Sequence, residues 1–204
     1  MISVNATGLA CPFPVIEAKK ALRKSGSEDV VVRVDNEVAV KNLQRLADSM
    51  QRKHSLSKIS DDLFELTIKG GKSESSEVKS QAGSESDNIF SQKKSEYIVQ
   101  FGSKFMGSDN EELGAVLIKS FIYSLTEQDC LPVALVFYNR GVELTCAGSP
   151  VLEDLKTLEQ AGTSIISCGT CLDFLKIKDK LALGEITNMY RIAELLRSYH
   201  TVCP

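Results

Sequence analysis

The sequence predicts an α/β protein built from two different domains, and three features of the chain carry this prediction. Along most of its 204 residues, short apolar runs typical of strands alternate with segments whose apolar residues recur at helical spacing. Residues 71–95 interrupt that pattern, because they are rich in Ser, Gly, Glu and Lys and contain few large apolar side chains. The run Val133–Tyr138 is almost continuously apolar, as is typical of a strand buried on both faces of a parallel sheet. We therefore expect domains at residues 1–70 and 96–204, joined by a flexible linker at 71–95.

The first domain is expected to follow the order βαβαββ. Its elements come, in chain order, from Ile2–Val4, a helical face of Val15, Ala18 and Leu22, the β-branched run Val30–Val34, a helical face of Leu43, Leu46, Ala47 and Met50, and alternating runs at residues 56–59 and 63–68. Asn36 is placed to cap the second helix, and Asp61-Asp62 separates the last two strands as a hairpin turn. This order predicts a two-layer sandwich, with two helices on one face of a small mixed sheet.

The second domain is expected to be an open, mainly parallel α/β sheet. Strands are predicted at residues 97–101, 133–138 and 163–167, and helices at about 111–121, 150–160 and 189–199. Ser108 and Glu111 have the spacing of a capping box at the start of the first of these helices. Strands that alternate with helices in this way favour parallel pairing, because each helix can return the chain to the same end of the sheet.

Composition and charge exclude several classes of protein. A net charge of −3 provides no basic surface for a nucleic-acid backbone, so we expect no direct nucleic-acid partner. No apolar run approaches the roughly 20 residues of a membrane span, and the first residues lack the pattern of a signal peptide, which predicts a cytoplasmic protein without a membrane partner. Six cysteines in such a compartment stay reduced, so they indicate thiol chemistry, metal binding or simple burial.

The segment Cys11-Pro12-Phe13-Pro14 places a cysteine where the first helix is expected to begin. Proline is favoured at the first helical position because its missing N–H has no partner within the helix there, so we expect Cys11 at the N-cap. The positive end of the helix dipole favours a thiolate at this place, and Pro14 stiffens the same turn. Cys11 is therefore a candidate nucleophile, and burial as a structural cysteine is the alternative.

This Cys-Pro-x-Pro motif, set between a short strand and an amphipathic helix, resembles the TusA/SirA family of sulfur carriers. Residues 1–70 resemble the family in the order of their elements as well. In that family the cysteine of the motif carries a persulfide, so the resemblance implies this role for Cys11. Pro12 and Pro14 are the supporting residues of the motif.

A second thiol site is predicted at Cys168-Gly169-Thr170-Cys171, which follows directly on the strand that ends at Ser167. Open α/β sheets place their ligands and their chemistry at the carboxyl ends of strands. Two cysteines at this spacing can form a local disulfide, exchange thiols with a partner, or supply half of a zinc site. The spacing alone leaves these three roles open.

From Tyr97 onward, the order of elements and the segment Phe137–Val142 resemble the DsrE-like family, in which a reactive cysteine follows a late parallel strand. Cys168 matches that place, and Cys171 is a departure from it. A TusA-like domain joined to a DsrE-like domain is similar to YedF-type proteins linked to selenium metabolism. The resemblance also implies that the C-terminal domain can form homo-oligomers.

Together these features predict a sulfur or selenium carrier, sulfurtransferase-like in its reaction, that relays persulfides between cysteines. Cys11, Cys168 and Cys171 are the expected reactive residues, with Cys168 as acceptor and Cys171 as the resolving thiol. We expect no cofactor beyond a transient cysteine persulfide or perselenide. The expected partners are a donor of the cysteine desulfurase type and a protein that accepts the sulfur or selenium.

Two alternatives come from other functional classes. In the first, the protein is a non-catalytic regulator whose C-terminal cleft binds a small molecule or a partner, and neither cysteine site reacts. In the second, the protein is an interaction module stabilised by zinc, with ligands from Cys168-x-x-Cys171 and His200-x-x-Cys203. The last pair is expected at a loose terminus, which weighs against a closed metal site.

Overall fold

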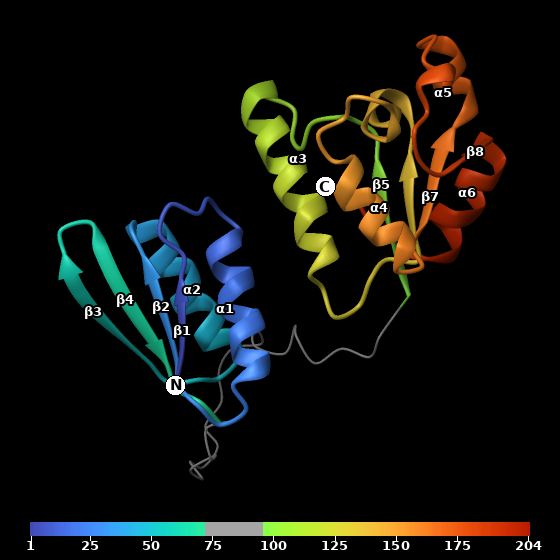
Figure 1. The fold of residues 1–204 in the computed structure, drawn as a ribbon. Coiled ribbons are helices and arrows are strands. Elements are labelled where there is room, and N and C mark those ends of the chain that lie inside the picture. Colours follow the sequence, from blue (N-terminus) through green and yellow to red (C-terminus); the bar gives the residue numbers. More distant parts are fainter. Residues whose placement is uncertain (72–95) are drawn as a thin grey trace, which may run out of the picture. The chain divides into compact units, whose positions relative to one another are not determined.

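The structure is a computed structural model of the chain that describes residues 1–71 and 96–204 (Figure 1). The chain divides into two compact units between Gln92 and Lys93. All but the first residue of the predicted linker lies outside the described residues.

The amino-terminal unit has the predicted order βαβαββ. Its elements are β1 (Ile2–Asn5), α1 (Phe13–Lys24), β2 (Val30–Val34), α2 (Glu37–Ser49), β3 (His54–Ser60) and β4 (Leu63–Ile68). The sheet order is β1-β2-β4-β3, in which β1 pairs with β2 in parallel and the other pairs are antiparallel. The two helices pack on one face of this mixed sheet (Figure 1), so the predicted two-layer sandwich is confirmed.

One core fills the space between that sheet and its helices. Alternate residues of β4 are buried, namely Phe64, Leu66 and Ile68, as expected for a strand with one face toward a core. Ala18 and Leu22 of the predicted helical face of α1 are buried against them. This packing holds the start of α1 close to α2, where the first cysteine site lies.

The carboxy-terminal unit is an open parallel sheet. Its main elements are β5 (Tyr97–Phe101), α3 (Glu111–Thr126), β6 (Ala134–Phe137), α4 (Leu152–Gln160), β7 (Ser164–Cys168), α5 (Gly169–Phe174), β8 (Glu185–Thr187), α6 (Met189–Ser198) and β9 (His200–Val202). Two short 3₁₀ helices, η1 (Asn139–Thr145) and η2 (Lys178–Lys180), complete it. The strand order is β8-β7-β6-β5-β9, and all four pairs are parallel. The predicted fold class is confirmed.

Buried apolar strands form the centre of this unit. All four residues of β6 are buried, as the apolar run predicted. The ring of Phe137 stacks on Phe101 with centroids 4.8 Å apart, and Phe121 of α3 meets Phe101 edge-on at 6.2 Å. These contacts connect β5, β6 and α3, and the loops that follow β5 and β6 therefore emerge at the same end of the sheet.

The helix caps agree with the sequence in one unit and differ in the other. Asn36 caps α2 as predicted, since its side-chain oxygen accepts the N–H of Ala39 at 2.8 Å. The predicted capping box at Ser108 is wrong. Asn110 caps α3 instead by accepting the N–H of Leu113 at 2.9 Å, whereas the Ser108 hydroxyl bonds to Asp109.

The carboxy-terminal residues are part of the sheet, which corrects the expectation of a loose end. β9 pairs in parallel with β5, with His200 opposite Tyr97 and Val202 opposite Val99. Just beyond β9, the sulfur of Cys203 accepts a hydrogen bond from Gln100 Nε2 at 2.7 Å. None of the helices in the described part of the chain has the length and apolar character needed to cross a membrane.

Candidate functional site

Cys11 is an exposed thiol in the connection between β1 and α1. The helix begins at Phe13 with Pro12 in the cap position, so Cys11 precedes the N-cap instead of occupying it. Pro12 and Pro14 have no N–H, and the N–H of Phe13 donates to the carbonyl of Ala10 at 3.0 Å. The first turn therefore offers few free N–H groups to bond the sulfur of Cys11.

The loop before Cys11 is anchored to the end of β2. The carboxylate of Asp35 accepts the N–H of Gly8 at 2.5 Å, and Gly8 has a φ of 74°, a conformation that glycine adopts without strain. The backbone hydrogen bond from Gly8, followed by one from the side chain of Asn36, lowers the pKa of Asp35 below its ordinary value. The ionised carboxylate thus holds the loop in place at neutral pH.

A small hollow of about 90 Å³ lies beside the thiol of Cys11. It is bordered by the starts of α1 and α2, and Asn42 Nδ2 lies 4.0 Å from Cys11 Sγ, within the range of a weak hydrogen bond to sulfur. Leu9 and Val38 are exposed apolar residues that line the hollow, and the exposed Phe13 is two residues after Cys11 in the chain. A partner that reaches Cys11 therefore meets a mainly apolar surface, in which Asn36 and Asn42 are the polar side chains that line the hollow.

The second site has Cys168 as the last residue of β7 and Cys171 in the first turn of α5, as the sequence predicted for the end of this strand. Cys168 is fully buried, whereas Cys171 is half-buried. The backbone N–H of Asn139, just after the neighbouring strand β6, donates to Cys171 Sγ at 3.0 Å. The structure thus brings together two thiols and a main-chain donor from two adjacent strand ends.

The two thiols of this pair influence one another. Burial raises the pKa of Cys171 most, the N–H of Asn139 opposes that effect, and the adjacent thiol of Cys168 raises the pKa further. Cys171 is therefore mainly a protonated thiol at neutral pH. All six cysteines of the chain are free, so the pair is in its reduced form.

Gly169 is required by the packing of the pair against the edge of the sheet. A Cβ atom at this residue would lie 2.9 Å from Cγ2 of Ile186 and 3.3 Å from the carbonyl oxygen of Thr187. Both neighbours belong to β8, whose residue Thr187 pairs with Cys168. The absent side chain lets the start of α5 lie directly against this strand.

The four residues of the alternative zinc site come from distant parts of the sheet. Strands β6 and β5 separate β7 from β9, which places their axes roughly 14 Å apart at about 4.8 Å per strand. His200 begins β9, whereas Cys168 ends β7, so these residues also lie at opposite ends of the parallel sheet. In the two ranges that the structure describes, no three His, Cys, Asp or Glu side chains converge as metal ligands.

Two polar neighbours of the thiols were not predicted from the sequence. Asn42 lies on α2, 31 residues after Cys11, and Asn139 acts through its backbone, which any residue type could supply.

Two other cysteines of the carboxy-terminal unit are not part of the Cys168–Cys171 pair. Cys146 is buried at the end of η1 and lines a separate pocket, in which neither Cys168 nor Cys171 takes part. Cys130 is half-buried, and its carbonyl accepts the Tyr97 hydroxyl at 3.0 Å.

Comparisons with known proteins found one family model and several solved structures that are similar to this chain. Residues 2–70 match the family model described as sulfurtransferase TusA. A SirA-like protein from Desulfitobacterium hafniense is 39% identical over 35% of this chain and 100% of its own, with a TM-score of 0.33. The ychN protein from E. coli is 16% identical over 54% of this chain and 99% of its own, with a TM-score of 0.43. A protein of unknown function from Methanobacterium thermoautotrophicum is 16% identical over 53% of this chain and 96% of its own, with a TM-score of 0.37. No curated protein matches the chain.

The family match and the 39% identity, together with the βαβαββ sandwich and its exposed Cys11, define the amino-terminal unit as a sulfur-carrier domain. The chain belongs to the TusA/SirA family through this unit. The carboxy-terminal unit, whose fold is the parallel sheet described above, adds a second site with the two thiols Cys168 and Cys171 to that carrier.

Proposed function

We propose that the chain carries sulfur or selenium as a persulfide or perselenide on Cys11 and passes it to the Cys168–Cys171 pair. The observation that carries this proposal is the exposure of Cys11 in a domain of the TusA/SirA family. Its loop is fixed by Asp35, and its sulfur borders an open hollow. In this proposal the carrier works in the reducing cytoplasm, where its thiols stay free.

Loading of Cys11 is a thiol exchange with a donor of the cysteine desulfurase type. The thiolate of Cys11 attacks the outer sulfur of the donor's cysteine persulfide, the S–S bond of the donor breaks, and the donor cysteine leaves as a thiolate. Cys11 then carries the persulfide, and no external oxidant or reductant is needed. The hollow of about 90 Å³ has room for the added atom, since a water molecule occupies about 30 Å³ in the liquid.

The exposures of the two thiols in the second site favour an order opposite to the one expected from the sequence. Cys168 is fully buried, so an incoming persulfide meets Cys171 first. The Asn139 N–H, 3.0 Å from Cys171 Sγ, stabilises negative charge on that sulfur during attack. Cys171 is therefore proposed as the acceptor and Cys168 as the resolving thiol.

Release follows from the spacing of the pair. The thiolate of Cys171 attacks the outer sulfur on Cys11, Cys11 leaves as a thiolate, and Cys171 becomes the persulfide. The thiolate of Cys168 then attacks Sγ of Cys171, closes a Cys168–Cys171 disulfide and expels hydrosulfide, or hydroselenide when selenium is carried. The final acceptor protein receives that anion, and a dithiol protein reductant must reduce the disulfide before the next cycle.

Intact-mass spectrometry tests the loading step. The full chain is incubated with a cysteine desulfurase and either cysteine or selenocysteine, with Cys11→Ser and Cys130→Ser variants in parallel. All three proteins also carry Cys171→Ser, so that an atom loaded on Cys11 is not passed on and expelled. A gain of one sulfur or one selenium atom is then expected in the Cys171→Ser parent and in Cys130→Ser, and no gain in Cys11→Ser. Equal loading of Cys11→Ser and the parent, mapped to another cysteine, would contradict the proposal, and the two substrates distinguish sulfur from selenium.

A further inference from the structure

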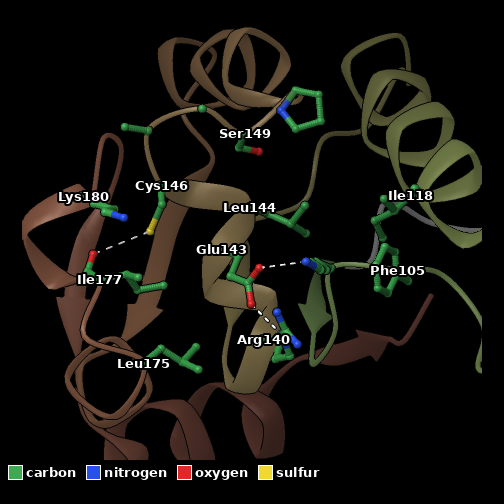
Figure 2. A pocket seen from close by; sticks show the side chains of 15 residues that line it. Phe105, Ile118, Arg140, Glu143, Leu144, Cys146, Ser149, Leu175, Ile177 and Lys180 are labelled. Carbon is green, nitrogen blue, oxygen red and sulfur yellow. Dashed lines mark hydrogen bonds and ion pairs between the residues drawn. The ribbon is translucent and has the colours of Figure 1, made fainter. Parts of the chain in front are cut away.

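A pocket of about 590 Å³ opens in the carboxy-terminal unit, where the loops after β5 and β6 meet (Figure 2). Its walls are apolar and come from Phe105, Ile118, Leu144, Leu175 and Ile177. The volume lies within the range of about 300 to 1,000 Å³ that is usual for small-molecule sites. Apolar walls of this extent suit the body of an organic molecule better than a sulfide ion.

The rim of the pocket carries an excess of positive charge. Arg140 Nε lies 2.6 Å from one carboxylate oxygen of Glu143, and Lys104 Nζ lies 3.1 Å from the other; Figure 2 marks both contacts with dashed lines. Burial disfavours the ionised form of Glu143, but the hydrogen bonds from Arg140 and Lys104 outweigh it and hold the pKa of Glu143 below its ordinary value. Lys180, on the opposite side, forms no ion pair with any side chain that the structure describes. Among the residues that line the pocket, three cations thus face one carboxylate, while the carboxylates of Asp179 and Glu111 lie near Cys146 and Arg140 outside the lining.

The inner wall of the pocket is uncharged. Cys146 Sγ donates a hydrogen bond to the carbonyl oxygen of Val142 at 3.3 Å. It also lies 3.9 Å from the carbonyl oxygen of Ile177, a contact that Figure 2 marks with a dashed line. Burial, followed by the nearby carboxylate of Glu143, raises the pKa of the Cys146 thiol, which stays protonated at neutral pH. The charge of the pocket is therefore confined to its rim.

We propose that this pocket binds a small organic anion with an apolar body. The apolar part lies between Ile118, Leu144 and Ile177, and the anionic group lies at the rim beside Lys180. The site is separate from the sulfur relay, because neither Cys11 nor the Cys168–Cys171 pair lines it. It shares the short helix η1 with that pair, since η1 carries both the Asn139 N–H and the rim residues Arg140 and Glu143.

Two probes of the same shape and opposite charge test the proposal: 4-phenylbutyrate and 4-phenylbutylamine. They are titrated into the full chain, and binding is followed by the NMR shifts of isoleucine and leucine methyl groups. We expect the carboxylate to shift the methyl groups of Ile118, Ile177 and Leu144 and to bind roughly tenfold more tightly than the amine, because the rim has two excess positive charges. Equal affinity for both probes, or no shift of these methyl groups, overturns the proposal.

Paired variants identify the groups that bind the probe. Lys180→Gln should weaken binding of 4-phenylbutyrate about two- to fivefold, the usual size of one exposed ionic contact, whereas Lys178→Gln in the same helix η2 should leave it unchanged. Lys178 does not line the pocket and pairs with Asp173 at 3.1 Å. Ala115 lines the pocket from an exposed position on α3, so Ala115→Trp should block it. Val116 is exposed but does not line the pocket, so Val116→Trp should leave binding unchanged. Unchanged binding in both Lys180→Gln and Ala115→Trp shows that the probe binds elsewhere and overturns the proposal.

Discussion

Gly169→Ala should loosen the contact between α5 and β8 that positions the Cys168–Cys171 pair. The new Cβ would lie 2.9 Å from Ile186 Cγ2, whereas carbon atoms at an optimal contact are about 3.5 to 4.0 Å apart. The side chain of Ile186 is 43% exposed and can move, but the carbonyl of Thr187, 3.3 Å away, belongs to the paired backbone of β8. Either Ile186 or the start of α5 must shift by roughly 0.6 Å, the shortfall from that optimal distance.

The expected loss of stability is the balance of two effects. Overpacking by one methyl group typically costs about 1 to 3 kcal/mol, and here the cost is about 1.5 to 2 kcal/mol, in the lower half of that range, because Ile186 can move. Replacement of glycine by alanine at an unstrained helical residue stabilises the fold by about 0.4 to 1 kcal/mol, because it lowers the conformational entropy of the unfolded chain. The net loss is therefore about 1 kcal/mol, which corresponds to a fall in Tm of about 4 °C for a unit of this size.

Tyrosine fluorescence during urea unfolding measures this loss in the carboxy-terminal unit alone. All five tyrosines lie between residues 97 and 199, and the chain has no tryptophan. Thr170→Ala, on an exposed residue next in the chain, is the control and should change little. In an Ile186→Ala background the effect of Gly169→Ala should disappear, because the nearest contact is gone. Wild-type stability of Gly169→Ala, or the same loss in both backgrounds, would refute the packing argument.

Two further predictions concern the same unit. Alkylation of Cys171 should be slow at pH 7 and accelerate with a midpoint above the ordinary thiol value of about 8.5, because burial and the Cys168 thiol both raise its pKa; Cys168→Ala should move the midpoint down. Peptide-level mass spectrometry of iodoacetamide labelling measures this, and a midpoint at or below the ordinary value contradicts the assignment. Asn110→Ala should cost about 1 kcal/mol, since it removes the acceptor for the Leu113 N–H, while Ser108→Ala should be close to neutral. Urea unfolding followed by tyrosine fluorescence compares them, and a larger loss in Ser108→Ala would restore the capping box that the sequence predicted.

The architecture of both units was predictable because it depends on local patterns. Apolar periodicity located each helix of the amino-terminal unit, and the apolar run before Tyr138 located the buried strand β6. The same patterns did not predict the short strands. β8 and β9 have three residues each, too few for a periodic signal, and their pairing depends on strands far away in the sequence.

The cap of α3 shows the limit of local chemistry. Ser108 and Asn110 are both good capping residues within three positions, and the choice depends on where the helix packs. The backbone of Gly114 packs against Phe105 and Met106. A Cβ atom added at Gly114 would lie only 2.9 Å from Phe105 Cβ. The sequence contains the candidates, and the tertiary contact selects between them.

The reactive residues of the candidate sites could be predicted from the sequence, but the burial and the neighbours of these residues could not. Cys11 and the Cys168–Cys171 pair were found from motif and strand position. Their unequal exposure was not, because the burial of Cys168 depends on neighbouring strands and on η1. The pocket lined by Cys146 combines residues from 104 to 180, a range over which no sequence pattern links them.

The sulfur relay is tested most directly by locating the sulfur after transfer from Cys11. The chain is loaded with labelled sulfur at Cys11, and wild type, Cys168→Ser and Cys171→Ser are sampled over time by peptide-level mass spectrometry. In Cys168→Ser the label should leave Cys11 and stay as a persulfide on Cys171, because the resolving thiol is missing. In Cys171→Ser it should remain on Cys11. Loss of label from Cys11 at one common rate in all three proteins, with none recovered on Cys171, would contradict transfer between the two sites.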